Sequence, residues 1–260
     1  MHEKTWMFKE TRLRIKCDMK EAIDVAIDAA FRARWEIEKT IARYPEFRWS
    51  LMPIEIPGNH HRVVELMLKA GKIADVGPFA AVAGAISQVA MEAALEAGAT
   101  DIIVENGGDI ALAGSREFRV GIFAGESTSS LGFLVRPEEL PLGICTSSGT
   151  VGHSISFGDS DAVVVVAREA SIADAAATSI GNAVRGENLS QSIHLGLERA
   201  KKIPEIFGCL VIRKNQIGVW GKLPELITSS ESKEISHTIS MYQKYAPPAF
   251  LFSAPKSLYL

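Results

Sequence analysis

The sequence predicts an α+β fold, because helical and strand-like patterns come in separate runs and neighbouring strands are joined as hairpins. Residues 19–45 carry apolar side chains at helical spacing, and a proline ends the pattern. Residues 161–169, DAVVVVARE, form the continuous apolar run of a buried strand. Residues 208–221 predict a closing hairpin around Lys214 and Asn215. This order favours mixed or antiparallel sheets over a doubly wound parallel sheet.

The remaining elements follow from alternation, helical periodicity and turn residues. Residues 8–17 alternate polar and apolar side chains, as a half-buried strand does. Gly77 and Pro78 open an apolar helix, and Gly98 lies at its C-terminal end. The long first helix places its larger apolar side chains near one face, namely Ile23, Ile27, Phe31, Trp35 and Ile41. Further helices are predicted at residues 60–76, 171–186 and 190–203, and strands at 47–57, 100–114, 116–125, 131–136 and 140–158.

Composition and charge describe an ordinary globular chain and exclude several function classes. The 260 residues are 47% hydrophobic and 23% charged, which is enough for one large core. The net charge is −3 and no basic run occurs, so no nucleic-acid partner is expected. Residues 1–222 are expected to form a single domain. Residues 223–260 are Ser-rich and then apolar with prolines, and we expect an irregular tail that packs on the body or on a partner subunit, as in a homodimer.

The chain is expected to work in the cytoplasm without a membrane. Its first 17 residues are charged and alternating, and they lack the apolar core of a signal peptide. The apolar stretch from residue 78 to residue 97 contains Gln88, Glu92 and Glu96, so a buried, closely packed helix explains it better than a membrane span. The three cysteines are widely spaced, which indicates neither a disulfide framework nor a CxxC metal site.

Two glycine turns have the character of a binding site. In ADVGPFAAVAG, Asp75 precedes a turn into a helix, whose free N–H groups could hold an anion; alternatively, Asp75 simply caps that helix. In VENGGDIALAG, Gly107 and Gly108 let another group approach the backbone closely. Asn106 and Asp109 could then face a ligand, although the same four residues are also a common hairpin signal.

A third stretch, GICTSSGTVGHSISFGDSD, is rich in hydroxyl groups and glycine. Its side chains and bare N–H groups would suit a phosphate, and the residues concerned are Thr146, Ser147, Ser148 and Gly149. It is not a Walker A loop, because the Gly-Lys-Ser/Thr ending is missing. His153 could act as an acid, a base or a ligand, or could be an ordinary packed residue. Cys145 could be a nucleophile, or a buried and inert thiol.

The helix SIADAAATSIGNAV places a carboxylate and a hydroxyl on one face. Asp174 and Thr178 are four residues apart, and such a pair suits a hard cation such as Mg²⁺. A structural alternative is open here, because Ser171 and Asp174 also fit the S-x-x-D signature of a helix start. The local sequence favours capping.

Taken in order, these four stretches resemble the motifs of the ApbE superfamily, typified by FAD:protein FMN transferases. The counterparts are DVGPFA from Asp75, NGGDI from Asn106, TSSG from Thr146 with His153, and ADAAAT ending at Thr178. The resemblance spans roughly the central 115 residues, from about position 70 to about position 185. It implies an ApbE-like fold of two related, intertwined lobes, with mixed or antiparallel sheets, packed helices and a ligand cleft between the lobes.

The resemblance also implies ligands and site residues. The metal helix of the superfamily corresponds to Asp174 and Thr178, and its third ligand, a carbonyl, falls at about Ala80. Mg²⁺ is therefore the implied metal, and FAD or another nucleotide is the implied cofactor. The flavin contacts would fall on residues 106–109 and 146–149. Asp109 would orient the ligand, and the downstream histidine would be the nearby group that titrates close to neutral pH.

More narrowly, KETRLRIKC with CTSSGTVGHSISFG and ADAAATSIGN is similar to an uncharacterised ApbE-like family of methanogenic archaea and sulfate-reducing bacteria. That family is associated with sulfide assimilation in methanogens. The resemblance leaves three functions open. The chain could bind a flavin or nucleotide with a metal, handle sulfur in homocysteine formation through Cys145, or serve as a non-catalytic accessory protein.

Two departures from the transferase pattern bear on activity. The transferases carry a lysine shortly after the glycine turn, where this chain has Ala80, Ala81 and Val82. Their histidine is followed by Ile-x-Asp-Pro, whereas this chain reads HSISFGDSD. The missing cation weakens the grip on a pyrophosphate, and a group to activate an acceptor hydroxyl is missing from its place. We therefore expect a metal-dependent transferase with changed chemistry, or a binding protein, rather than a full FAD:protein FMN transferase.

Overall fold

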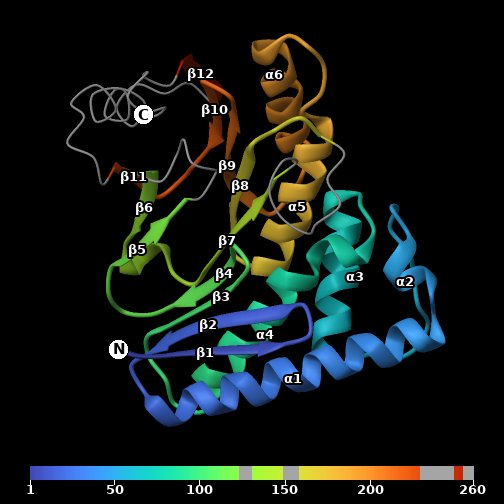
Figure 1. The fold of residues 1–260 in the computed structure, drawn as a ribbon, viewed down its shortest axis with the longest axis vertical. Coiled ribbons are helices and arrows are strands. Elements are labelled where there is room, and N and C mark those ends of the chain that lie inside the picture. Colours follow the sequence, from blue (N-terminus) through green and yellow to red (C-terminus); the bar gives the residue numbers. More distant parts are fainter. Residues whose placement is uncertain (123–130, 149–157, 229–248, 254–260) are drawn as a thin grey trace.

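A computed structural model describes residues 1–122, 131–148, 158–228 and 249–253 of the chain. The described residues form one large sheet, one small sheet and a layer of helices (Figure 1). This arrangement confirms the predicted α+β class with antiparallel sheets. The predicted relation between two lobes of the chain stays a prediction.

The large sheet has nine strands in the order β1-β2-β3-β4-β7-β8-β9-β10-β12, and every neighbouring pair is antiparallel. Its strands are β1 (His2–Phe8), β2 (Thr11–Cys17), β3 (Ile102–Asn106), β4 (Asp109–Ala113), β7 (Leu142–Ser147), β8 (Ala162–Ala167), β9 (Ile206–Arg213), β10 (Gln216–Gly221) and β12 (Ala249–Ser253). The small sheet has the order β11-β6-β5, with β5 (Phe118–Gly121), β6 (Leu131–Val135) and β11 (Glu225–Thr228).

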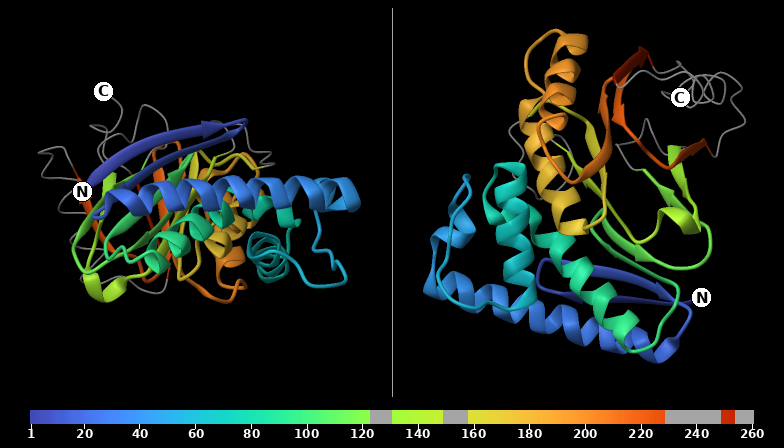
Figure 2. Two further views of the ribbon diagram at one scale, coloured as in Figure 1. Left: turned by 90° about the horizontal axis from the view of Figure 1, so that it is seen from below. Right: turned by 180° about the vertical axis from the view of Figure 1, so that it is seen from behind.

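The helices cover one face of the large sheet, and the small sheet packs on the other (Figures 1 and 2). They are α1 (Lys20–Arg43), α2 (Glu46–Trp49), α3 (Arg62–Ala74), α4 (Val82–Glu96), α5 (Ala170–Ala183) and α6 (Leu189–Ala200), with short 3-10 turns η1 (Pro78–Ala81) and η3 (Pro137–Glu139). Successive side chains of a strand point to opposite faces. In β8, Val163 and Val165 therefore join the core under the helices, while Val164 and Val166 join the core under the small sheet.

The apolar face of α1 differs from the predicted one. Ile23 and Ile37 are buried, together with a row of alanines, but Phe31 and Trp35 have 46% and 59% of their surface exposed. Small side chains let α1 approach α4 closely, so the helix is buried through its alanines rather than its aromatic residues. Phe31 instead packs edge-on against Phe8 of the neighbouring strand β1, with 5.1 Å between ring centroids.

Several other segments correct the predicted elements. The segment predicted as one strand at residues 8–17 contains the turn and the second strand, β2, of a hairpin. In this hairpin, β1 and β2 pair from residue 2 to residue 17. The strand predicted at residues 47–57 is absent, and helix α2 occupies its start. The strand predicted at residues 116–125, which was expected to continue the sheet of residues 100–114, instead contains β5 of the small sheet. The expected irregular tail contains two strands, β11 and β12, and thereby contributes to both sheets.

One helical stretch, Pro78–Glu96, is long and apolar enough to cross a membrane, judged on the described residues. However, 61% of its most apolar window is buried inside the fold. This burial agrees with the predicted packed helix. Glycine explains how close the packing is, because a Cβ at Gly84 would lie 2.3 Å from the carbonyl oxygen of Ala170 and 2.8 Å from the Cβ of Asp174.

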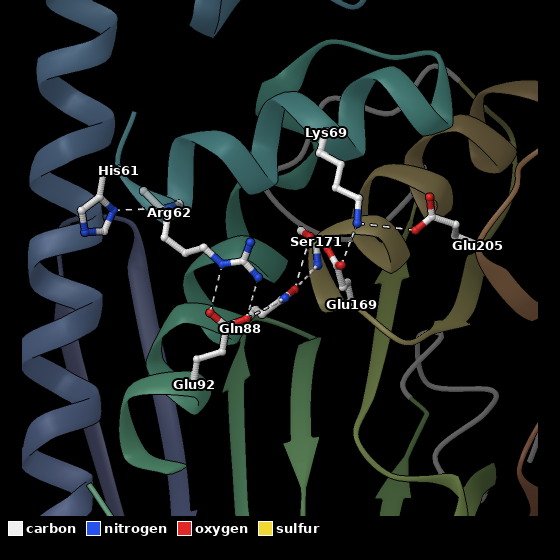
Figure 3. A network of polar contacts seen from close by, with 9 residues as sticks. His61, Arg62, Lys69, Gln88, Glu92, Glu169, Ser171 and Glu205 are labelled. Carbon is white, nitrogen blue, oxygen red and sulfur yellow. Dashed lines mark hydrogen bonds and ion pairs between the residues drawn. The ribbon is translucent and has the colours of Figure 1, made fainter. Parts of the chain in front are cut away.

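A polar network ties α3, α4 and the start of α5 together (Figure 3). Arg62 donates from two nitrogens to the carboxylate of Glu92, at 3.2 and 3.0 Å. Glu92 also accepts from the amide of Gln88 at 3.0 Å, and the other end of Gln88 accepts from both the N–H and the hydroxyl of Ser171 at 3.3 Å. Gln88 and Ser171 are buried, so each of these bonds replaces one that water would otherwise make.

Replacing Gln88 by methionine tests this network. The change keeps the shape but leaves two buried donors of Ser171 without an acceptor. We expect the free energy of unfolding to fall by about 1–3 kcal/mol. Urea unfolding measures it, with Gln191→Met, an exposed helical glutamine, as the matched control. Equal stability of the two variants would contradict the prediction.

Candidate functional site

The glycine turn between β3 and β4 is a two-residue hairpin turn. Gly107 and Gly108 both have positive φ, of 64° and 104°, which side chains other than glycine rarely adopt. Asn106 and Asp109 pair across the turn at the ends of their strands. The hairpin alternative of the sequence is therefore confirmed. It does not exclude a ligand, because the turn leaves the backbone uncovered by side chains.

The side chain of Asn106 serves the fold. Its oxygen accepts from the N–H of Arg12 at 3.3 Å, and its amide donates to the carbonyl of Ala83 at 3.4 Å. These bonds join the hairpin to β2 and to the first turn of α4. Because Asn106 is buried and both ends of its amide are used, its primary contribution is to position the turn.

Asp109 is buried at the start of β4, on the face that carries the helices. Its side chain accepts from the N–H of Thr146 at 3.3 Å, and its own carbonyl accepts from the hydroxyl of Ser87 at 2.9 Å. Burial raises the pKa of Asp109 well above its usual value, and the nearby carboxyl of Asp174 raises that pKa further. The Thr146 N–H opposes these effects but does not cancel them.

Asp174 caps a helix, but not its own. Helix α5 begins after Glu169 without a side-chain capping bond, so the S-x-x-D prediction for Ser171 and Asp174 was wrong. Instead, the Asp174 carboxylate accepts from the N–H of Gly84 at 2.8 Å, in the first turn of α4. The N-cap residue of α4 is Ala81, whose side chain has no hydrogen-bond acceptor. A carboxylate from the neighbouring helix therefore caps α4 instead.

The Asp174 carboxyl is nevertheless poised between two charge states. Burial raises its pKa to about 7, while the amides of Gly84 and Ala83 hold the pKa down. The interactions that shift the pKa values of Asp109 and Asp174 include no cationic side chain. One buried and one half-buried carboxyl lie close together without a counter-charge among the described residues, and a bound cation would stabilise their ionised forms.

The other two predicted metal ligands, Thr178 and Ala80, lie on α5 and on η1. Asp174 and Thr178 are both half-buried, whereas the other central residues of α5 are almost all buried, so these two side chains share the accessible side of the helix. Ala80 is half-buried in η1, which packs on α5. Among the described residues, no three His, Cys, Asp or Glu side chains gather as a metal site. A cation here would therefore depend on Asp174, a hydroxyl and carbonyl oxygens.

Ser147 contributes a polar group near this face. It follows Cys145 by two residues on β7, so both side chains point toward the helices. The Ser147 hydroxyl is buried and has no hydrogen-bond partner within the described part of the chain. Such a group is the kind that an ordered water or a ligand satisfies. The predicted residues Gly149 and His153 lie outside the described residues.

Cys145 has the surroundings of an inert thiol. It is fully buried, and its sulfur donates to the carbonyl of Ala170 at 3.2 Å. Burial raises the pKa of the Cys145 thiol well above its usual value, and the carboxyls of Asp109 and Asp174 add to the shift. The N–H of Ile110 lowers this pKa, but burial and two acidic neighbours outweigh it.

Asp75 has a structural role at the end of α3. It ends α3 in the left-handed conformation, with φ of 54°, and its carboxylate lies 3.6 Å from Arg199. It makes no capping bond to the helix that follows, so that alternative was wrong. Gly77 is required by packing, because a Cβ there would lie 1.8 Å from the carbonyl oxygen of Ser50.

A cavity of 560 Å³ lies on the opposite face of the sheet, beside the glycine turn. Five of the predicted site residues line it, namely Gly107, Gly108, Asp109, Thr146 and Ser148. Asn106, Ser147, Asp75, Asp174, Thr178 and Ala80 are not among its lining residues. The cavity also has charged walls that the motifs did not predict, formed by Arg14, Lys16, Glu105 and Arg119. For Arg14 and Lys16, the signal was the alternation of TRLRIKC, whose polar positions 12, 14 and 16 are all basic.

Comparison with protein families gives one consistent result. The family model described as "AbpE bacteria" matches residues 2–199. A UPF0280 protein of Methanocaldococcus jannaschii is 39% identical over 244 residues, covering 92% of this chain and 99% of that protein. A UPF0280 protein of Methanosarcina barkeri is 44% identical over 223 residues, covering 85% of this chain and 87% of that protein.

Solved structures share the fold at low sequence identity. The flavin transferase ApbE from Vibrio cholerae matches with a TM-score of 0.56 and 14% identity, covering 90% of this chain and 98% of that chain. The ApbE protein from Thermotoga maritima matches with a TM-score of 0.54 and 12% identity, with the same coverage. The likeness establishes an ApbE-like fold.

The raised pKa of Asp174 predicts a pH effect on stability. A carboxyl whose folded-state pKa is raised stabilises the fold while protonated, and this contribution is lost as the pH rises from about 4 to about 7. In EDTA, we expect Asp174→Asn to match the wild type near pH 4 and to be more stable by about 1–3 kcal/mol at pH 8. Urea unfolding at both pH values measures this. A constant difference between the two proteins would contradict it.

The buried thiols predict slow alkylation. All three cysteines are fully buried, and burial raises the pKa of Cys209 to about 12 and that of Cys145 well above its usual value. With iodoacetamide at pH 8, we expect each thiol to react at least about a hundredfold more slowly in the native protein than in urea. Mass spectrometry of the peptides follows each site. Rapid native modification of Cys145 alone would support the sulfur-handling function instead.

Proposed function

We propose that this chain, which belongs to the UPF0280 family, binds a flavin or another nucleotide together with a divalent cation. The observation that carries the proposal is the pair of neighbouring carboxyls, buried Asp109 beside the glycine turn and half-buried Asp174, without a cationic partner among the described residues. Asp109 also lines the cavity, although its carboxyl points to the helix side of the sheet, so the glycine hairpin separates the acid pair from the cavity.

The residues present fit a hard cation such as Mg²⁺. Asp174 uses one oxygen for the N–H of Gly84, and its second oxygen is the proposed ligand. Thr178 lies one helical turn further along the same stripe, and the carbonyl of Ala80 is the proposed third protein ligand. When bound, the cation would neutralise charge on phosphate oxygens and hold them in place. This assignment follows the resemblance to the ApbE superfamily.

The chain's own groups would bind and orient the ligand. The uncovered backbone at Gly107 and Gly108 admits a flat ring or a ribose close to the main chain. Thr146, Ser147, Ser148 and Gly149 are proposed to offer hydroxyls and N–H groups to phosphates. Asp109, held by the Thr146 N–H, orients the ligand, and His153 is proposed as the acid or base.

We propose altered chemistry rather than complete transfer of FMN to a protein. Where the transferases carry a lysine, this chain has Ala80 to Val82 in η1 and the first residue of α4. A metal-dependent transferase acting on another acceptor and a binding protein both fit this arrangement. The position of the acid pair supports the cation under either alternative.

Binding of FAD with Mg²⁺ tests the proposal. Asp174→Asn retains an acceptor for the Gly84 N–H but removes the charge, so the fold should persist while the cation is lost. We expect FAD with Mg²⁺ to raise the melting temperature of the wild type and to lose at least about tenfold in affinity in the variant. Calorimetric titration measures the affinity, with exposed Asp24→Asn as control. The absence of FAD binding to the wild type, or unchanged Mg²⁺ dependence in Asp174→Asn, would overturn it.

A further inference from the structure

The cavity has a basic wall that the family motifs do not include. Arg14 and Lys16 are two residues apart on β2, so both project from the same face of the large sheet. The alternate residues of that strand, Leu13, Ile15 and Cys17, are fully buried under the helices. Arg14 and Lys16 are thereby directed to the side of the sheet on which the cavity lies.

A third cation comes from the other sheet. Arg119 is an exposed residue of β5, and it lines the same cavity. Within the described residues, Arg119 has no acidic side chain within ion-pair distance. Three positive charges from two sheets therefore border one cavity, opposed by Glu105. The Asp109 carboxyl points to the helix side of the sheet, toward Cys145 and Asp174, so the wall is positive on balance.

Glu3 forms ion pairs with two of these cations, Arg14 and Lys16. Its carboxylate lies 2.6 Å from the Nε of Arg14 and 3.5 Å from the Nζ of Lys16, although Glu3 does not itself line the cavity. All three side chains are about half exposed, and ion pairs of this kind contribute little free energy. An incoming anion can therefore take the place of Glu3 at low cost, and it would find two cations already side by side.

The rest of the cavity indicates what carries the anion. Its lining includes branched apolar side chains from both sheets, namely Ile103, Ile110, Ile144, Val164, Val120 and Ile122. The volume falls within the range of small-molecule sites. An apolar lining next to a cationic wall suits a ligand that has both a flat apolar ring and a phosphate.

The geometry points to a phosphate-binding subsite formed by Arg14, Lys16 and Arg119, which takes the phosphate of a ring-bearing small molecule. The inference deepens the proposed function, and it rests on that function for the identity of the ring. These cations would supply, from the first hairpin and the small sheet, the positive charge that the chain lacks at Ala80 to Val82. Arg side chains suit this role because their planar guanidinium binds two phosphate oxygens at once.

Inorganic pyrophosphate is the probe that tests the subsite directly. We expect calorimetric titration to detect binding by the wild-type protein. In the double variant Arg14→Gln/Arg119→Gln the affinity should fall at least about tenfold, since charge-assisted bonds to phosphate are lost. Arg12→Gln, on the same strand but outside the cavity lining, is the matched control and should bind as the wild type does. Glu3→Gln should bind more tightly, because it removes the competing carboxylate.

The outcomes separate the subsite from the proposed function. Absence of pyrophosphate binding by the wild type, or equal binding by the double variant, overturns the inference. A matching titration with FAD and Mg²⁺ tests the proposed function on the same proteins. Pyrophosphate binding that depends on Arg14 and Arg119, without FAD binding, supports the subsite and rejects the flavin. FAD binding that is unaffected in the double variant supports the flavin and rejects the subsite.

Discussion

The structure around the candidate site depends on the contact between Asp174 of α5 and the first turn of α4. The carboxylate accepts from the Gly84 N–H, and only glycine at that position leaves room for the two helices to approach so closely. The contact fixes the start of α4, and Asn106 then bonds to the carbonyl of Ala83 in the same turn. One acid side chain thus positions two helices and the hairpin that carries the glycine turn.

This arrangement explains why a structural role and a ligand role can coincide. An acid that caps a neighbouring helix is stabilised by amide dipoles, but a second acid, the buried Asp109, lies beside it without a counter-charge in the described residues. In the absence of a cation, the pair resists ionisation, as the raised pKa values indicate. A bound divalent cation would convert this unfavourable pair into a stable one. The basic wall formed by Arg14, Lys16 and Arg119 lies on the opposite face of the sheet, where it would take a phosphate.

Much of the fold followed from local patterns, whereas the side-chain partners did not. The hairpin at Gly107 and Gly108 was predictable because two consecutive glycines between strands favour a turn with positive φ. The run of valines in β8 was predictable as a strand buried on both faces. The capping role of Ser171 and Asp174 was mispredicted because their true partners, Gln88 and Gly84, come from another helix. Such contacts depend on how α4 and α5 pack, which a local signature does not report. The basic wall was missed for the same reason.

The central claim is that half-buried Asp174 and buried Asp109 form an acid pair that accepts a divalent cation. The most direct measurement is a carbon-13 NMR titration of the aspartate carboxyls, assigned with Asp174→Asn, without metal and with saturating Mg²⁺. The account predicts that the pKa of Asp174 lies near 7 without metal and falls well below its usual value when Mg²⁺ is present. A pKa near 4 in the metal-free protein, or one that Mg²⁺ does not change, would contradict it.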